Sequence, residues 1–151
     1  MIVCCSDSRV PPELVFDQTL GQLFVVRTAG QVIDEAARGS IVYGVDFLNA
    51  PLLLVLGHSG CGAVDAAIAA LAGSPIPGYA YRFAEGIGPA VQSVHDQPGD
   101  QLDNAIRANI EMGVDQLRTA EPVLAAAVRS GSLTVAGGYY DLASGEVSIL
   151  T

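Results

Sequence analysis

Short apolar runs separated by glycines and polar residues dominate the hydrophobic pattern of this chain. Four runs are rich in leucine and β-branched residues and have no polar face, which is typical of strands covered on both sides of a parallel sheet. They are Met1–Cys4, Leu23–Val26, Leu52–Leu56 and Leu133–Ala136. A fifth segment, Glu146–Ile149, alternates after the turn Asp141–Gly145. This segment is predicted to be an antiparallel edge strand reached through a hairpin.

Apolar residues at helical spacing fill the gaps between these strands. One stripe follows a possible N-cap at Asp34, and a second occupies the region after residue 100. The two stripes comprise Ile33, Ala37, Ile41, Val45 and Leu48, and then Leu102, Ile106, Ile110, Val114 and Leu117. Ala66–Ala72 reads as a close-packed helix, and a further helix can restart at Glu121–Pro122 and close at Gly131. Three helices are therefore expected between the third and fourth strands.

The order of these elements predicts an α/β fold. Its sheet is mostly parallel, with about four parallel strands plus an antiparallel C-terminal edge strand, and with helices on its faces. A length of 151 residues, of which half are hydrophobic and 15% are charged, indicates one folded domain over residues 1–151.

The charge balance narrows the possible partners. Seven basic residues, all of them arginine, stand against sixteen acidic residues and give a formal net charge of −9. A nucleic-acid-binding protein needs a basic surface, and so does a protein that binds anionic membranes, so neither partner is expected. The longest apolar run, Pro51–Leu56, is too short to span a bilayer. Three cysteines without a visible export signal indicate a reducing compartment and a cytoplasmic location.

Three potential metal ligands stand at the ends of two predicted strands. Cys5 ends the first strand, and His58 and Cys61 follow the third within a glycine-rich turn. If these strands are neighbours, two thiolates and one imidazole would leave one tetrahedral zinc position open, which is the pattern of a catalytic rather than a structural site. The alternative is that each buried cysteine is simply a small apolar residue.

Asp7 and Arg9 lie two residues apart just after Cys5, so their side chains can pair on one side of an extended segment. An exposed pair of this kind contributes little to stability. Beside a metal, the arginine would instead hold the carboxylate ionised, and the carboxylate would accept a hydrogen bond from metal-bound water.

Three motifs in register resemble the signature of the β-class carbonic anhydrases. They are Cys5-Ser-Asp-Ser-Arg9, Phe24-Val-Val-Arg-Thr-Ala-Gly30 and Gly57-His-Ser-Gly-Cys-Gly62, and the similarity extends to Tyr140-Asp141 and the turn Ser144-Gly145. The resemblance covers nearly the whole chain. It implies reversible hydration of carbon dioxide to bicarbonate and a proton by zinc-bound hydroxide.

The resemblance also assigns roles to individual residues. It implies one zinc ion per chain on Cys5, His58 and Cys61, with Asp7 and Arg9 as the catalytic pair. It further implies a homodimer or a higher even homo-oligomer, whose substrate pocket lies at the interface and is lined in part by the other subunit. By motif position, the residues expected in that pocket are Phe24, Ala29, Tyr43 and Gly62.

Two departures from the family pattern affect these expectations. Some members bind a regulatory bicarbonate through Trp, Arg and Tyr; Arg27 matches the arginine, but Ile2 stands at the tryptophan position and the chain has no Trp. That form of the site is therefore not expected here. The chain is also expected to lack the family's N-terminal helical arm, since only four residues precede Cys5.

Two alternatives to carbon dioxide hydration remain. The same ligands can serve a hydrolase of carbonyl sulfide or carbon disulfide, or a non-catalytic zinc-binding assembly module. The pair Asp7 and Arg9 speaks against the module, because a structural zinc site has no use for it. Of the remaining polar candidates, Cys4 is expected to pack on the opposite face of its strand, and His95 to be solvated at a polar helix end.

Overall fold

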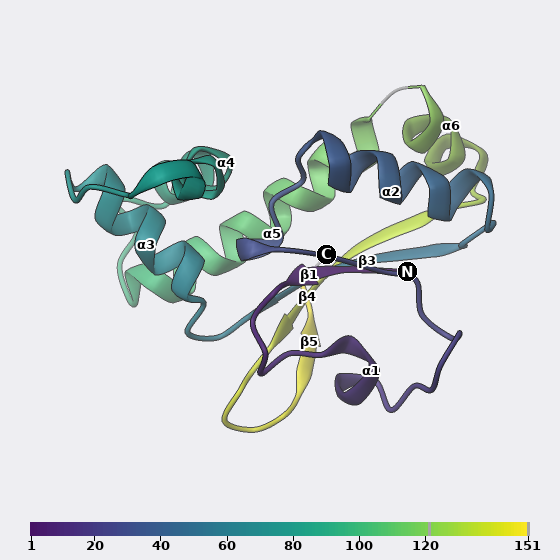
Figure 1. The fold of residues 1–151 in the computed structure, drawn as a ribbon, viewed down its shortest axis with the longest axis horizontal. Coiled ribbons are helices and arrows are strands. Elements are labelled where there is room, and N and C mark those ends of the chain that lie inside the picture. Colours follow the sequence, from purple (N-terminus) through teal and green to yellow (C-terminus); the bar gives the residue numbers. More distant parts are fainter. Residues whose placement is uncertain (121, 151) are drawn as a thin grey trace.

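The computed structural model describes residues 1–120 and 122–150. One five-stranded sheet runs through it in the order β2-β1-β3-β4-β5 (Figure 1). The strands are β1 (Ile2–Cys5), β2 (Val25–Thr28), β3 (Leu52–His58), β4 (Thr134–Tyr140) and β5 (Val147–Ile149). All neighbours are parallel except β4 and β5, which are antiparallel. The predicted fold class, including its antiparallel C-terminal edge, is confirmed.

The helices lie mainly on one side of this sheet. Figure 1 shows α2, α5 and α6 along one face, the short α1 on the other, and α3 and α4 together toward one end. Their bounds are α1 (Pro12–Val15), α2 (Glu35–Asp46), α3 (Gly62–Leu71), α4 (Tyr81–Ser93), α5 (Gln101–Thr119) and α6 (Val123–Ser130), with 3-10 turns η1 (Ala29–Gln31) and η2 (Gly78–Ala80). No helix among the described residues is both long and apolar enough to cross a membrane.

The number of helices between β3 and β4 differs from the prediction, whereas the limits of α6 agree with it. In the described part of the chain, four helices rather than three connect β3 to β4, because α4 forms despite Gly86, Gly88 and Pro89. Its buried Ile87 and Val91 supply the packing that the local sequence pattern does not reveal. The Pro122 and Gly131 limits expected for α6 are confirmed, with Gly131 in the left-handed conformation at its end, whereas Glu121 lies outside the described residues.

The sheet buries both of its faces, as its unbroken apolar strands predicted. One face packs against the larger helices, and the second, smaller face packs against α1 and the loop after it. Along β1 the alternation sends Val3 and Cys5 to the first cluster and Ile2 and Cys4 to the second. Cys5 and Cys4 therefore have different environments although they are adjacent in sequence.

Parallel pairing brings the ends of the strands to one edge. Cys5 pairs with Thr28 on β2, and His58, the last residue of β3, pairs with Tyr140 on β4. Because β1 and β3 are direct neighbours, the polar segments that follow them emerge side by side. This register is the structural reason that residues 5 and 58 can belong to one site.

Gly57 precedes His58 and is closely packed against α5. A Cβ atom at this position would lie 2.6 Å from Ile110 Cδ1, and Ile110 is fully buried. Gly57→Ala is therefore expected to lower the free energy of unfolding by about 1–3 kcal/mol through overpacking. Chemical denaturation of the metal-free protein measures this change.

Gly39 provides the matched control, since it is exposed within α2 and a Cβ there would meet nothing within 4 Å. Gly39→Ala should raise the free energy of unfolding by about 0.5–1 kcal/mol, because alanine loses less backbone entropy in a helix. Equal effects of the two substitutions would contradict the packing argument for Gly57.

Candidate metal centre

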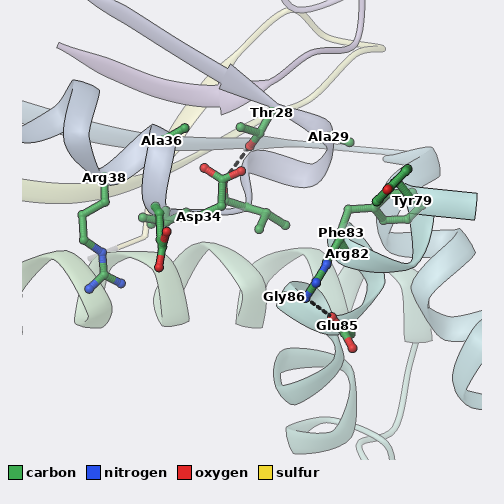
Figure 2. Close-up of a pocket in the computed structure, with 13 residues that line it drawn as sticks. Thr28, Ala29, Asp34, Ala36, Arg38, Tyr79, Arg82, Phe83, Glu85 and Gly86 are labelled. Carbon is green, nitrogen blue, oxygen red and sulfur yellow. Dashed lines mark hydrogen bonds and ion pairs between the residues drawn. The ribbon is translucent and has the colours of Figure 1, made fainter.

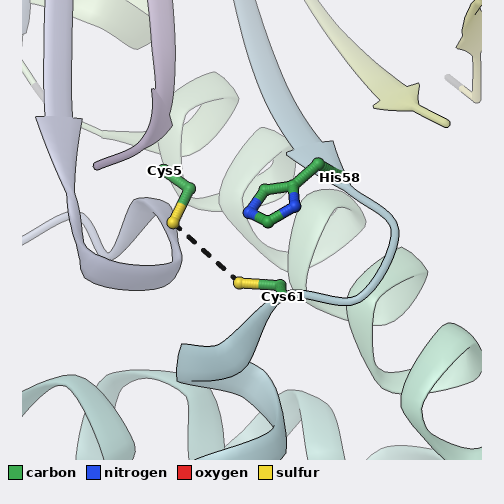
Figure 3. A group of neighbouring side chains, drawn as sticks. All are labelled: Cys5, His58 and Cys61. Carbon is green, nitrogen blue, oxygen red and sulfur yellow. Dashed lines mark hydrogen bonds between the residues drawn. The ribbon is translucent and has the colours of Figure 1, made fainter. Parts of the chain in front are cut away.

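Cys5, His58 and Cys61 converge at the carboxyl edge of the sheet (Figure 3). Cys5 and His58 are the last residues of β1 and β3, and Cys61 is the N-cap of α3 after a turn in which Gly60 has a positive φ of 61°. All three side chains are buried, and their potential ligand atoms lie within 4.8 Å of one another. The structure thus brings together the three ligands expected from the sequence.

The donor set fits a zinc ion. The two sulfur atoms are 4.0 Å apart, close to the separation of about 3.8 Å that tetrahedral geometry gives two sulfurs bound at about 2.3 Å. The His58 Nδ1 atom lies 3.0 Å from the Ser59 carbonyl oxygen, while its buried Nε2 has no hydrogen-bond partner among the described residues. A carbonyl that fixes one ring nitrogen and leaves the other free is the usual arrangement around a metal-bound histidine.

The surroundings of the two thiols differ. The hydrogen bond with Cys61 lowers the pKa of Cys5 well below that of a free thiol, and the Gly30 N–H, 3.3 Å from Cys5 Sγ, acts in the same direction. The same sulfur–sulfur hydrogen bond, followed by burial, raises the pKa of Cys61. A thiolate is therefore favoured at Cys5, and thiolates are the form in which cysteine binds metals.

Asp7 and Arg9 form a bidentate pair next to the three ligands. Arg9 Nε donates to Asp7 Oδ1 at 2.9 Å, and Arg9 Nη2 donates to Oδ2 at 2.6 Å. These hydrogen bonds hold the pKa of Asp7 far below that of a free carboxyl group. Asp7 Oδ2 also lies 4.0 Å from His58 Nε2, so the carboxylate faces the position between the ligands while it stays on Arg9.

Arg27 fixes the loop that carries this pair. Its Nε donates to the Cys5 carbonyl at 2.9 Å and its Nη2 to the Asp7 carbonyl at 2.6 Å. The sequence pointed to Arg27 only through a regulatory site whose tryptophan is replaced by Ile2. Every residue type carries a backbone carbonyl, so the residues that accept these hydrogen bonds cannot be recognised from the sequence. The role of Arg27 in holding the loop therefore had no sequence signal.

The two remaining polar candidates occupy the places expected of them. Cys4 is fully buried in the smaller apolar cluster, where burial raises its pKa to about 12, so it packs as an inert apolar residue. His95 follows the end of α4 and is exposed beside Asp96, with 2.9 Å between its Nδ1 and the carboxylate.

The four residues expected in a substrate pocket fall into two groups. Ala29 begins η1 directly after Thr28, which pairs with Cys5, and Gly62 begins α3 directly after Cys61, so both adjoin the candidate ligands. Phe24 precedes β2, and Tyr43 on α2 packs against it with 6.0 Å between the ring centroids. Phe24 lies four residue steps before Thr28, a rise of about 13 Å along the chain, so one chain does not bring this second group to its own three candidate ligands.

A groove of about 1360 Å³ starts beside Ala29 and runs between η1, α2 and α4 (Figure 2). Its walls carry both signs of charge together with aromatic rings. They include Asp34, Arg38, Tyr79, Arg82, Phe83 and Glu85. The Tyr79 side chain is strongly exposed, so this groove offers apolar surface to a partner.

Comparisons with known proteins agree on one family. The family model described as carbonic anhydrase matches residues 1–147. The chain is 41% identical to carbonic anhydrase 2 of Mycobacterium tuberculosis, over 97% of this chain and 71% of that protein. It is 39% identical to a carbonic anhydrase of Mycolicibacterium smegmatis, over 96% of this chain and 71% of that protein.

Solved structures agree with the sequence comparisons. The β-carbonic anhydrase of Coccomyxa, solved in complex with acetazolamide, superposes with a TM-score of 0.87 at 29% identity, covering 99% of this chain and 70% of that one. The fold, the Cys-His-Cys group and these likenesses lead to one conclusion: this chain belongs to the β-class carbonic anhydrase family, a family of lyases.

Proposed function

We propose that this protein catalyses the reversible hydration of carbon dioxide to bicarbonate and a proton, with one zinc ion per chain held by Cys5, His58 and Cys61. The observation that carries this proposal is the Asp7–Arg9 pair placed against three convergent, buried ligands. A structural zinc site is normally closed by four protein ligands, whereas this group has three, with a carboxylate beside the remaining position.

Each residue then has a defined part in the reaction. When bound, zinc lowers the pKa of water at its open position, which is the chemistry that hydration of carbon dioxide requires. Arg9 keeps Asp7 ionised and oriented through two hydrogen bonds, so the carboxylate is an acceptor only. Asp7 can accept a hydrogen bond from a donor group that lies beside His58 Nε2. That hydrogen bond would fix the orientation of the donor group toward the substrate.

The substrate pocket is proposed to form between two copies of the chain. Phe24 and Tyr43 lie too far from the ligands of their own chain, and Tyr43 stacks on Phe47, which is largely exposed. The groove beside Ala29, with its mixed charges and exposed Tyr79, supplies a surface on which a second copy can dock. A homodimer or a higher even oligomer would place the aromatic pair of one chain near the ligands of the other.

Stopped-flow hydration of carbon dioxide against pH tests the proposed activity. Two thiolates offset the charge of Zn²⁺, so the rate is expected to rise from about pH 7 toward about pH 9 rather than to level off near neutrality. Asp7 should not contribute to this profile, because its lowered pKa keeps it ionised throughout.

Zinc content and oligomeric mass are measured on the same sample, and carbonyl sulfide is assayed in parallel. Hydrolysis of carbonyl sulfide without hydration of carbon dioxide would replace the proposed substrate. A zinc-loaded oligomer inactive on both gases would instead indicate the assembly module. A zinc-loaded monomer with full hydration activity would contradict the shared pocket.

A further inference from the structure

Cys5 has a second partner besides the other ligands. The Gly30 N–H donates to its sulfur at 3.3 Å. Amide hydrogen bonds of this kind orient a metal-bound thiolate and adjust its basicity. Gly30 has a positive φ of 62°, and a Cβ there would come within 2.6 Å of Ile87 Cδ1 and 3.2 Å of Ala63 Cβ, so only glycine fits. Glycine is also the residue least able to hold its own peptide in place.

The peptide after Gly30 is held from α5. The side-chain amide of Asn109 donates to the Gly30 carbonyl at 2.9 Å, across 79 residues of sequence. Asn109 is 4% exposed and lies on the buried face of its helix between Ile106 and Ile110, both fully buried. An apolar side chain would suit that position better by helix propensity and by desolvation.

The buried polar side chains of the described part of the chain gather around this contact. They are Gln31, His58 and Asn109. His58 is a proposed ligand, Gln31 adjoins Gly30, and the Gln31 Nε2 atom lies 3.2 Å from the place where a Cβ of Gly57 would stand. The buried polar side chains of the described residues are thus concentrated around the ligands and the backbone that supports them, rather than spread through the core.

We propose that Asn109 is a positioning residue for the metal centre: it anchors the Gly30 carbonyl so that the adjoining N–H stays on Cys5 Sγ, and it thereby tightens zinc binding. This inference rests on the proposed zinc site. It adds to that site a residue which touches neither the metal nor the substrate. The anchored carbonyl and the N–H flank the same Gly30 Cα, so the hydrogen bond from Asn109 limits how far the segment that carries the N–H can move away from Cys5 Sγ.

The test compares Asn109→Leu with Asn104→Leu. Both remove an α5 side-chain amide that donates to a backbone carbonyl, but Asn104 donates to Pro98 at 3.2 Å, outside the ligand group. The dissociation constant for zinc, measured by competition with a chelator, should rise about tenfold or more in Asn109→Leu and stay at the wild-type value in Asn104→Leu. The sulfur-to-cobalt charge-transfer band of the cobalt-loaded protein should shift in the Asn109 variant alone.

Asn109→Ala, which cannot overpack, is measured alongside. A lower melting temperature with an unchanged zinc dissociation constant and cobalt spectrum would reduce Asn109 to a structural residue and overturn the inference. A wild-type protein that binds no zinc would overturn the proposed function itself, so the two failures are distinguishable.

A measurement on the wild-type chain keeps the inference testable if a variant does not fold. In protein loaded with NMR-active cadmium, the Gly30 amide proton should show scalar coupling to the metal through Cys5 Sγ. Absence of that coupling in a cadmium-loaded, folded sample would overturn the inference.

Discussion

His58→Ala is expected to yield a folded protein that retains no zinc after dialysis and hydrates carbon dioxide at the uncatalysed rate. The imidazole supplies one of three proposed ligand atoms, and its Nε2 is buried without another hydrogen-bond partner among the described residues. Two thiolates alone do not complete a site that already has only three protein ligands. Metal analysis of purified protein, combined with stopped-flow assay, measures both effects.

His95→Ala is the matched control, because the chain has only two histidines and His95 is exposed beside Asp96. This variant should keep one zinc per chain and wild-type turnover. Added zinc should also raise the melting temperature of wild type and His95→Ala, since a ligand stabilises the state that binds it, and should leave that of His58→Ala unchanged. Full zinc occupancy in His58→Ala would refute the ligand assignment.

A candidate ligand cysteine and a cysteine outside the site can be compared in the same way. Cys61→Ala is expected to lose zinc, whereas Cys4→Ala is expected to keep it, since Cys4 points into the smaller apolar cluster on the other face of the sheet. Some loss of stability in Cys4→Ala is consistent with removal of a fully buried sulfur. Zinc binding that depended on Cys4 instead would show that the strand register around β1 is wrong.

The strands were predictable because burial on both faces leaves an unbroken apolar run. Leu52–Leu56 became β3, and only its last two residues, Gly57 and His58, lay beyond the run. The helix α4 was missed for the opposite reason, since Pro89 and two glycines break its local pattern while contacts with α3 and α5 stabilise it. The sequence of a segment indicates only its own helix propensity. Helix α4 depends instead on packing against other helices, which forms only in the assembled fold.

The same distinction applies to the site. Cys5, His58 and Cys61 were predictable, because parallel strands end at one edge and metal-binding side chains are chemically distinctive. The contact from Asn109 to the Gly30 carbonyl was not, because it joins positions 79 residues apart and ends on a backbone atom. A helix stripe read only for apolar residues passes over Asn109, which lies within that stripe.

Asp7→Asn should lower the turnover number for carbon dioxide by about two to four orders of magnitude, with one zinc per chain retained. The substitution preserves volume but removes the anion that Arg9 holds at 2.6 and 2.9 Å. It also places an amide donor where only an acceptor faces the ligands. Stopped-flow assay and metal analysis separate loss of catalysis from loss of zinc.

The sign of the pKa shift sharpens this prediction. Hydrogen bonds from Arg9 lower the pKa of Asp7, so the carboxylate is ionised across the neutral and alkaline range, and the defect should be the same size at every pH there. A defect confined to one part of that range would mean that Asp7 titrates during the reaction and is not simply a fixed acceptor. Asp96→Asn alters an exposed carboxylate beside His95 and should leave turnover unchanged. If Asp7→Asn also retained wild-type turnover, the pair with Arg9 would be a surface ion pair without a catalytic role.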